Sequence, residues 1–484
     1  AERLFDGYDL DGALVLAERG IGCGAGGAVL GSLRALCARI LFWRSQLDRA
    51  CALATEAVAL LPVGHVSALL AICILIAGAS QRRDVPELLR LAARITDADP
   101  DAPALGAYAE SGGLLSILLA YCGRREEAQA LLARIESCVE KKVASGAPGE
   151  AAVARARGWT LYARGRLTLL FTPDVWAALD AGRRAAAAFE ELADLRCLVL
   201  ARSLEVACLF ALGQTAQAAS VLRDALVLAD GLDEAVPGSE IAAAGALGLS
   251  EQPGLRPGSD EARQAAALSA RLIEAPHSTG QQRGAGYCAA AWLALAARDL
   301  PSAERAARAA VTEHADWPLH LLTSRVVLIT VLHRQGEHAQ AAAEAEAALR
   351  ALGAQGCDGV LAARLQLAAA DALQAAGQGA RAQSLRAGAA RRLEQLQRLC
   401  LAGLARDVGG REAAVVAQLG ARVFGARDDV AVPLDRDLRR NEPQAGDEVR
   451  HSGAVRHTRG LPVQDDGQHG RREGTTNVGR VCRT

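Results

Sequence analysis

Residues 332–348 read LHRQGEHAQAAAEAEAA and contain a spaced pattern that recurs along the chain. In this pattern Leu is followed by Gly four residues later, by Ala after five more and by a second Ala after another seven. The same spacing is complete at 209–225 and 373–389, and a copy at 41–57 has Ser in place of Gly and is followed by Pro62. We interpret each copy as a helical hairpin. The Leu packs the first helix, the Gly permits a tight turn, and the two Ala on one face let the second helix approach closely.

Weaker copies fill most of the remaining chain and give a period of roughly forty residues. The turn positions that follow from the pattern are 7, 45, 80, 123, 165, 213, 298, 336 and 377. After Gly165 the second helix is displaced by an insertion around Thr172-Pro173, and the long interval from 213 to 298 indicates one decayed hairpin between Asp230 and Gly284. The sequence therefore predicts an all-α solenoid of about nine to ten hairpins.

The composition favours the same architecture. Strong helix formers dominate the 484 residues, whereas aromatic residues make up only 3%. A chain of this length exceeds what one compact core can organise, and a stack in which each hairpin contacts only its neighbours avoids that limit.

The chain divides into five predicted stretches, each named by the pattern within it. They are helical repeats at 1–230, an irregular Pro/Gly-rich repeat or linker with only partial helices at 231–284, helical repeats at 285–404, a terminal helix within 405–425, and a disordered tail at 426–484. For the tail, out-of-frame translation is a second hypothesis. Because Met is absent even at position 1, we expect the chain to be a fragment, a processed product or a reading frame begun at a non-standard point.

Charge and hydropathy exclude several classes of partner. A net charge of −1 gives no electrostatic basis for binding nucleic acid. The longest apolar run, 66–79, is too short to cross a bilayer as a helix, so no membrane partner is expected. The 12 Cys are scattered without a Cys-x-x-Cys pair, which indicates reduced core residues in a cytoplasmic protein.

Motifs for catalysis, cofactors and metals are absent or misplaced. Residues 22–27 match Gly-x-Gly-x-x-Gly, but a helix is predicted before them where a dinucleotide site needs a strand, so a Gly-rich interhelical loop is favoured. No phosphate-binding loop, kinase catalytic triplet or nucleophile elbow occurs, and the His pairs 333/338 and 314/320 lack the spacing of a helical zinc site. We expect no catalytic residue, cofactor or metal.

The Leu-x3-Gly-x4-Ala-x6-Ala pattern over residues 1–400 resembles the tetratricopeptide repeat (TPR), with Leu where an aromatic is usual and a period nearer forty than thirty-four. This longer period looks like the divergent arrays at the C-terminal end of large bacterial signalling proteins. More narrowly, residues 1–20, 42–44 and 59–62 look like the helical region after the kinase and ATPase modules of myxobacterial-type Ser/Thr kinases. Neither module is present in this sequence.

In the TPR family the first helix of each hairpin lines a groove that binds partners. The resemblance places eleven residues at groove positions: Arg39, Phe42, Trp43, Tyr121, Arg155, Trp159, Tyr162, Phe210, Trp292, His333 and Arg334. Trp, Tyr and Arg dominate binding interfaces, which favours a binding surface. The same side chains favour packing between hairpins, and both interpretations stay open.

The leading hypothesis for function is a non-catalytic scaffold that binds a protein or peptide within a bacterial cytoplasmic signalling protein. The alternative is a regulatory C-terminal segment of a Ser/Thr kinase or nucleotide-switch ATPase whose catalytic module lies upstream. A small-molecule sensor domain is a third hypothesis and would need an enclosed apolar pocket.

Overall fold

The computed structural model describes residues 1–408 apart from 45, 233–234 and 277. The chain divides into two units, Ala1–Val432 and Pro433–Thr484, and every described residue belongs to the first. Helices occupy most of the described residues, and no strand occurs among them. The predicted all-α solenoid is therefore confirmed. The terminal helix expected within 405–425 lies almost entirely, and the tail at 426–484 entirely, outside the described residues.

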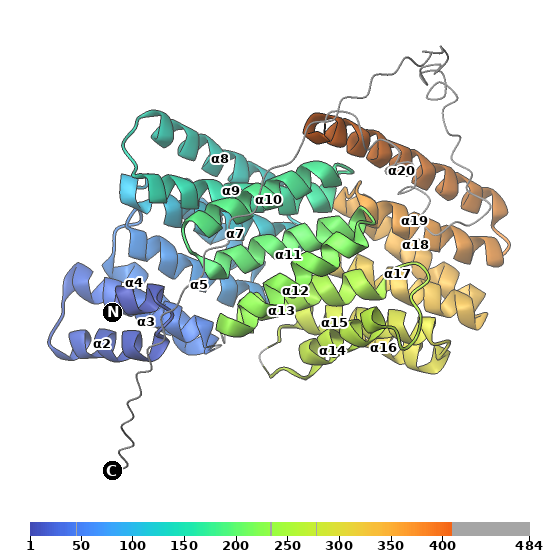
Figure 1. Ribbon diagram of the computed structural model, residues 1–484, viewed down its shortest axis with the longest axis horizontal. Coiled ribbons are helices and arrows are strands. Elements are labelled where there is room, and N and C mark those ends of the chain that lie inside the picture. The colour runs from blue at the N-terminus through green and yellow to red at the C-terminus, as the bar shows by residue number, and fades with distance from the viewer. Residues whose placement is uncertain (45, 233–234, 277, 409–484) are drawn as a thin grey trace, which may run out of the picture. The chain divides into compact units, whose positions relative to one another are not determined.

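The described helices follow one another as successive hairpins (Figure 1). In the first half of the chain they are α1 Glu2–Asp6, α2 Leu10–Gly22, α3 Gly27–Trp43, α4 Leu47–Leu60, α5 Val66–Arg82, α6 Val85–Thr96, α7 Leu105–Tyr121, α8 Arg125–Ala144, α9 Glu150–Phe171 and α10 Val175–Glu191. In the second half they are α11 Leu195–Ala211, α12 Thr215–Leu232, α13 Ala235–Ser250, α14 Asp260–Glu274, α15 Gly280–Ala296, α16 Leu300–Glu313, α17 Pro318–Gln335, α18 His338–Gln355, α19 Val360–Ala375 and α20 Gly379–Val408. A short 3-10 helix, η1 Ala102–Ala104, precedes α7.

The glycines of the repeated pattern make the turns inside the hairpins. Gly213, Gly336 and Gly377 have φ angles of 69°, 86° and 82°, a left-handed conformation that glycine adopts without steric cost. Arg298 adopts the same conformation at a φ of 60°, so the fold imposes this turn even where the glycine is missing. The alanines of the pattern are fully buried, as at Ala341 and Ala348.

Two predicted turns are placed differently in the structure. Around position 80 the left-handed residue is Arg83, because α5 continues to Arg82. At position 165 there is no turn, since α9 runs on to Phe171 and the break falls at the Thr172-Pro173 insertion. Gly165 serves close helix packing instead, because a Cβ there would lie 3.1 Å from the carbonyl oxygen of Ala178 on α10.

The stretch 231–284 contains two helices of ordinary length, α13 and α14, where only partial helices were expected. The prolines do not interrupt them. Pro237 lies in the first turn of α13, where backbone N–H groups have no intrahelical acceptor, and the other prolines lie in the connections after α13 and α14. The hairpin that seemed decayed in sequence is therefore present in the fold.

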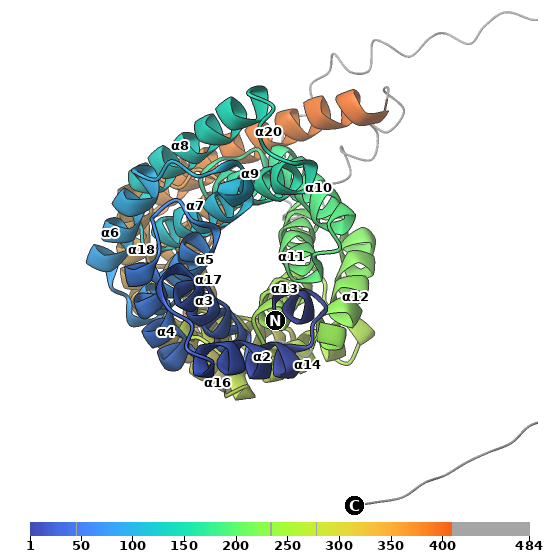
Figure 2. The same ribbon diagram turned by 90° about the vertical axis from the view of Figure 1, so that its left-hand side faces the viewer.

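The odd-numbered helices from α3 to α19 form an inner layer in which each contacts the next odd-numbered helix. The even-numbered helices cover this layer from outside, as α4, α6, α12, α14 and α16 do in Figure 2. Within the inner layer, the segment Ala102–Tyr121 is apolar and long enough to cross a membrane by length and composition, and it includes α7. Its apolar window is 83% buried inside the fold, where α7 packs on α5, α8 and α9, as expected of a core helix.

Hairpins that lie far apart in sequence also touch. The α1 hairpin reaches the start of α11, α7 contacts α17, and α10 contacts α20, so each contact joins helices ten apart. Arg125 at the start of α8 donates to the carbonyl oxygen of Gly356, the residue after α18, which repeats this offset. The stack therefore coils back on itself, and its inner layer is bounded by side chains from two distant parts of the sequence.

Candidate functional site: the inner helical face

The first polar cluster on the inner layer surrounds Arg196 of α11 and joins it to the N-terminal hairpin. The Arg196 guanidinium lies 4.6 Å from the ring centroid of Phe5, 4.5 Å from that of Tyr8 and 5.2 Å from that of Trp43. Arg39 of α3 stacks on Phe5 at 4.2 Å. Each contact is a cation–π interaction, which is stronger when it is removed from water. We call these five residues the Arg196 cluster.

A chain of charges continues from this cluster along the inner layer. Arg155 of α9 lies 3.2 Å from a carboxylate oxygen of Asp194 and 4.0 Å from one of Glu110. Asp194 also caps α11 by accepting from the backbone N–H of Cys197 at 3.2 Å. Burial raises the pKa of Glu110, although Arg155 and Arg39 oppose this effect. Arg155 and Arg39 thus offset the cost of burying the Glu110 carboxylate, and Arg155 does the same for Asp194.

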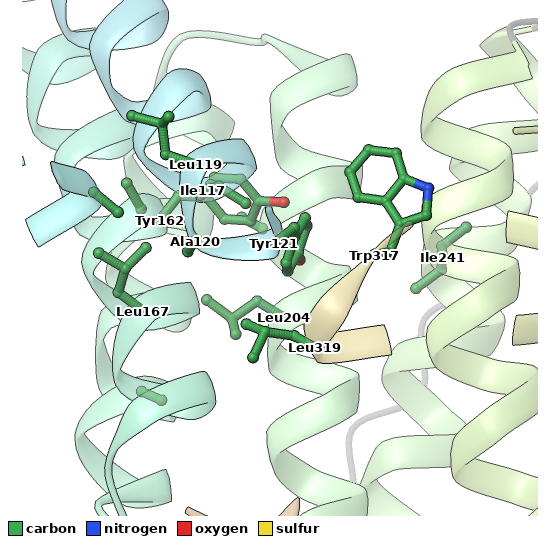
Figure 3. Close-up of a cluster of buried hydrophobic side chains, with 14 of the residues drawn as sticks. Ile117, Leu119, Ala120, Tyr121, Tyr162, Leu167, Leu204, Ile241, Trp317 and Leu319 are labelled. Atoms are coloured by element: carbon green, nitrogen blue, oxygen red, sulfur yellow. The ribbon is translucent and has the colours of Figure 1, made fainter. Parts of the chain in front are cut away.

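The second polar cluster joins residues of α7, α9, α11, α13 and α17, and Figure 3 shows two of its members, Tyr121 and Tyr162, among the buried side chains of this region. Arg166 donates to the Tyr162 hydroxyl at 3.1 Å, to the Ser203 hydroxyl at 3.1 Å and to Glu240 at 3.2 Å. The rings of Tyr121 and His320 are 4.6 Å apart, edge to face. Burial raises the pKa of Tyr121 to about 12, so its phenol stays neutral. This set connects α7 with α17, which are ten helices apart in the stack. We call its members the Tyr121 cluster, namely Tyr121, Tyr162, Arg166, Ser203, Glu240 and His320.

His320 belongs to a further hydrogen-bonded group at the start of α17. Its Nε2 accepts from the side-chain amide of Gln281 at 2.9 Å, the orientation that a neutral imidazole and the Gln281 amide permit. His314 lies within hydrogen-bond distance of the Ser324 hydroxyl, at 2.7 Å, and of the Gln281 carbonyl oxygen, at 2.9 Å. Burial lowers the pKa of both histidines, and that of His320 falls well below its usual value because His314 and Arg166 also lie nearby. Both imidazoles are therefore neutral at neutral pH.

All eleven groove positions named from the sequence lie on odd-numbered helices. Seven side chains are half-buried or exposed: Arg39, Phe42, Trp43, Arg155, Trp292, His333 and Arg334. Four are buried: Tyr121, Trp159, Tyr162 and Phe210. The structure brings Arg39, Trp43 and Arg155 to the Arg196 cluster and its chain of charges, and it brings Tyr121 and Tyr162 together.

The remaining positions are local pairs or stand apart from these clusters. Trp159 packs its ring against Tyr162 and Phe189, with centroids 5.7 Å and 6.0 Å away. Phe210 packs against Gly248 of α13, where a Cβ would lie 2.0 Å from its ring. His333 and His338 face each other with ring centroids 5.6 Å apart.

Sequence reasoning found Arg39 and Arg155 but missed other charged and polar members of these clusters. Glu110, Arg166, Arg196, Glu240 and His320 lie on inner helices, but the groove positions were chosen for aromatic, Arg and His residues at fixed distances from each turn. A signal does exist, because Glu110 is the only charged residue in α7. An isolated charge in an apolar helix indicates a paired or functional group.

A second concavity, of about 700 Å³, lies on the outside of the first repeats, where α4, α5 and α6 meet. Twelve residues line it: Cys51, Ala52, Thr55, Val58, Ala59, Leu61, Leu75, Arg82, Glu87, Arg90, Leu91 and Arg94. None of them was selected from the sequence.

Other chemical groups are few in the described part of the chain. No group of three or more His, Cys, Asp or Glu side chains in it is arranged to hold a metal ion. The ten cysteines from Cys23 to Cys357 are free thiols, and burial raises the pKa of Cys208 and of Cys288 to about 12. Residues 22–27 connect α2 to α3, so a helix precedes this glycine-rich loop.

No family model matches this chain, and no curated protein does. Among solved structures the chain is similar to a Rap protein complexed with competence and sporulation factor, at 13% identity and a TM-score of 0.45, over 74% of this chain and 96% of that one. It is also similar to the TPR domain of P58(IPK), at 12% identity and a TM-score of 0.19, over 86% of this chain and 98% of that one. At these scores neither likeness assigns a family or a function to the chain.

Proposed function

We propose that this solenoid is a non-catalytic interaction module that binds a protein or peptide segment on its inner helical face. The observation that supports this most is the exposure of aromatic and arginine side chains on the inner layer. Phe42 and Trp43, at the end of α3, stack edge to face with centroids 5.1 Å apart and remain half-buried. Half-exposed Trp and Arg are the groups that dominate binding energy when a partner covers them.

In this proposal the eleven groove residues have two roles. The half-buried and exposed ones, such as Trp43, Arg155 and Trp292, contact the partner. The buried ones, such as Trp159 and Tyr162, fix the helices that present them.

We also propose a setting for the module, a bacterial cytoplasmic signalling protein. The support is the sequence resemblance at 1–20, 42–44 and 59–62 to the helical region of myxobacterial-type kinases. The coding sequence upstream of Ala1 provides the test. A kinase or ATPase module there would make this solenoid its regulatory segment, and a different or absent module would reject that setting.

The binding proposal can be tested by selecting peptides on the full chain from a random-peptide display library. Selected peptides are then measured by fluorescence anisotropy against the wild type, Trp43→Ala and Trp292→Ala. Val227→Ala is the matched control, because Val227 is 73% exposed on the outer helix α12. We expect at least one tryptophan variant to weaken binding by about tenfold or more, with the control unchanged. If no peptide is selected, or if all variants bind equally, the inner-face proposal is rejected.

A further inference from the structure

The outer groove between α4, α5 and α6 combines an apolar floor with a basic rim. Val58, Leu61, Leu75 and Leu91 supply the apolar part, while Arg82, Arg90 and Arg94 supply the cations. The groove is outside the inner layer and shares no residue with the site proposed above.

Small side chains on α4 keep this groove open. Ala52, Thr55 and Ala59 line it and are exposed, and they follow one another at helical spacing. Cys51 and Arg82 lie over Gly78 of α5, where a Cβ would be 2.4 Å from the Cys51 sulfur and 3.1 Å from an Arg82 nitrogen. Because Gly78 has no side chain, Cys51 and Arg82 pack directly against the backbone of α5, and the space above them stays empty.

The charges that face the groove are not balanced within it. Glu87 is the only acid among the lining residues, and both its oxygens accept from Arg90, at 2.8 Å and 2.7 Å. Arg82 and Arg94 remain without an acidic partner among those residues. The Nε of Arg94 is buried and makes no hydrogen bond to any described residue, and one of its terminal nitrogens reaches only the Val58 carbonyl oxygen, at 3.4 Å. The Arg94 guanidinium therefore has no acid to pair with among the lining residues, and a bound carboxylate would supply one.

We propose that this groove binds an acidic peptide segment whose apolar side chains enter between α4 and α6 while its carboxylates contact Arg82 and Arg94. Charge complementarity selects the acids, and the accessible apolar surface of Leu75, Ala52 and Ala59 favours a peptide over a nucleic acid. Along α4 the exposed lining positions extend from Ala52 to Ala59, which is a length of two helical turns.

The test uses the full chain and a fluorescein-labelled probe peptide of alternating Leu and Glu pairs. A matched peptide with Gln for every Glu removes the charge, and a labelled oligothymidine tests nucleic acid. The groove variants are Arg82→Glu, which reverses a rim charge, and Thr55→Trp, which fills the groove from an exposed position. Arg305→Glu on α16 is the matched control, because Arg305 is exposed and is not among the lining residues. Helix content by circular dichroism must match the wild type for each variant.

We expect the acidic probe to bind, binding to fall with added salt, and both groove variants to weaken it by about tenfold or more. We expect the wild type to bind the Gln peptide no more tightly than the two groove variants bind the acidic probe. No binding of the acidic probe, equal binding of the Gln peptide, or equal losses with Arg305→Glu would overturn the proposal. Tighter oligothymidine binding that Arg82→Glu abolishes would assign the groove to nucleic acid instead. Dimerisation that Thr55→Trp abolishes in light scattering would assign it to a second copy of the chain. Trp43→Ala should leave probe binding unchanged, which keeps this result separate from the inner-face proposal.

Discussion

The Tyr8 hydroxyl accepts a hydrogen bond from the backbone N–H of Leu195 at 2.9 Å, although 187 residues separate the two. The same hydroxyl donates to the carbonyl oxygen of Ala193 at 3.3 Å. With the cation–π contacts of Arg196, these bonds attach the first hairpin to the start of α11. Hairpins that contacted only their neighbours in the stack would not make these bonds. The contact between Tyr8 and Leu195 therefore reports whether the stack coils back on itself in solution.

Replacing Tyr8 by Phe keeps the ring on Arg196 and removes both hydrogen bonds. We expect a local loss of about 1 to 2 kcal/mol, because two bonds are removed and each has a usual net value of about 1 kcal/mol. Hydrogen exchange at the amide of Leu195 should accelerate, while exchange in α17 and α18 stays unchanged. Tyr287→Phe on the half-buried face of α15 is the control and should change neither. If the Leu195 amide keeps the same protection from hydrogen exchange in the variant, Tyr8 and Leu195 are not in contact in solution.

His320 should make the fold sensitive to acid. Its folded pKa is well below the unfolded value of about 6.5, so above that pH both states are neutral and its contribution is constant. As the pH falls below about 6.5 the unfolded chain binds a proton that the folded chain excludes, and stability drops by up to about 1.4 kcal/mol per pH unit until the folded pKa is reached.

Chemical denaturation between pH 7 and pH 5 measures this loss. His320→Gln keeps a group that can accept from Gln281 and removes the titration, so its stability should depend less on pH in that window. His65→Gln, at the half-buried residue before α5, is the control for replacing a different histidine. Identical pH profiles for all three proteins would exclude His320 as the source.

Ala225→Leu should overpack the contact of α12 with its neighbours. Ala225 is 1% exposed, and an added isobutyl group forces side chains or helices apart at a cost of about 1 to 3 kcal/mol. Ala216→Leu, on an exposed position of the same helix, should cost nothing measurable. Thermal melts of both variants are the measurement, and equal shifts would show that the repeat register is wrong.

Trp159→Ala should cost about 3 to 5 kcal/mol of folding stability, as expected for removal of a buried indole. The Trp159 side chain is 4% exposed and contacts the rings of Tyr162 and Phe189. Urea denaturation and hydrogen exchange of α9 give the cost. A loss below about 1 kcal/mol together with weaker binding of selected peptides would place Trp159 in direct contact with the partner.

Gly336→Ala should destabilise the α17–α18 hairpin by about 1 kcal/mol, because an L-residue is strained at a φ of 86°. Gly353→Ala is the matched opposite case. Gly353 lies inside α18 with no atom within 4 Å of an added Cβ, so Ala should stabilise the helix by up to about 1 kcal/mol. The signs of the two changes in melting temperature should therefore be opposite, and equal signs would contradict the turn assignment.

The sequence alone determined the repeating hairpin, because its requirements are local. A turn residue that tolerates positive φ and two small residues on one face of the next helix can be recognised at any position, and Gly213, Ala218 and Ala225 occupy those places in the fold. It failed at Gly165, where the same glycine serves helix contact, since composition does not distinguish a turn glycine from a packing glycine. It also undervalued 231–284, because Pro237 is harmless in the first turn of a helix.

Only the tertiary structure decided which inner residues meet. Tyr8 and Leu195, or Tyr121 and His320, contact each other because small angles between successive hairpins add up over ten helices, and no local pattern encodes that sum. The same accumulation buries Trp159 and Tyr162 while Trp43 and Arg155 stay half-buried. The outer groove depends on how far α4 stands from α6 above Gly78, a distance that side-chain packing sets.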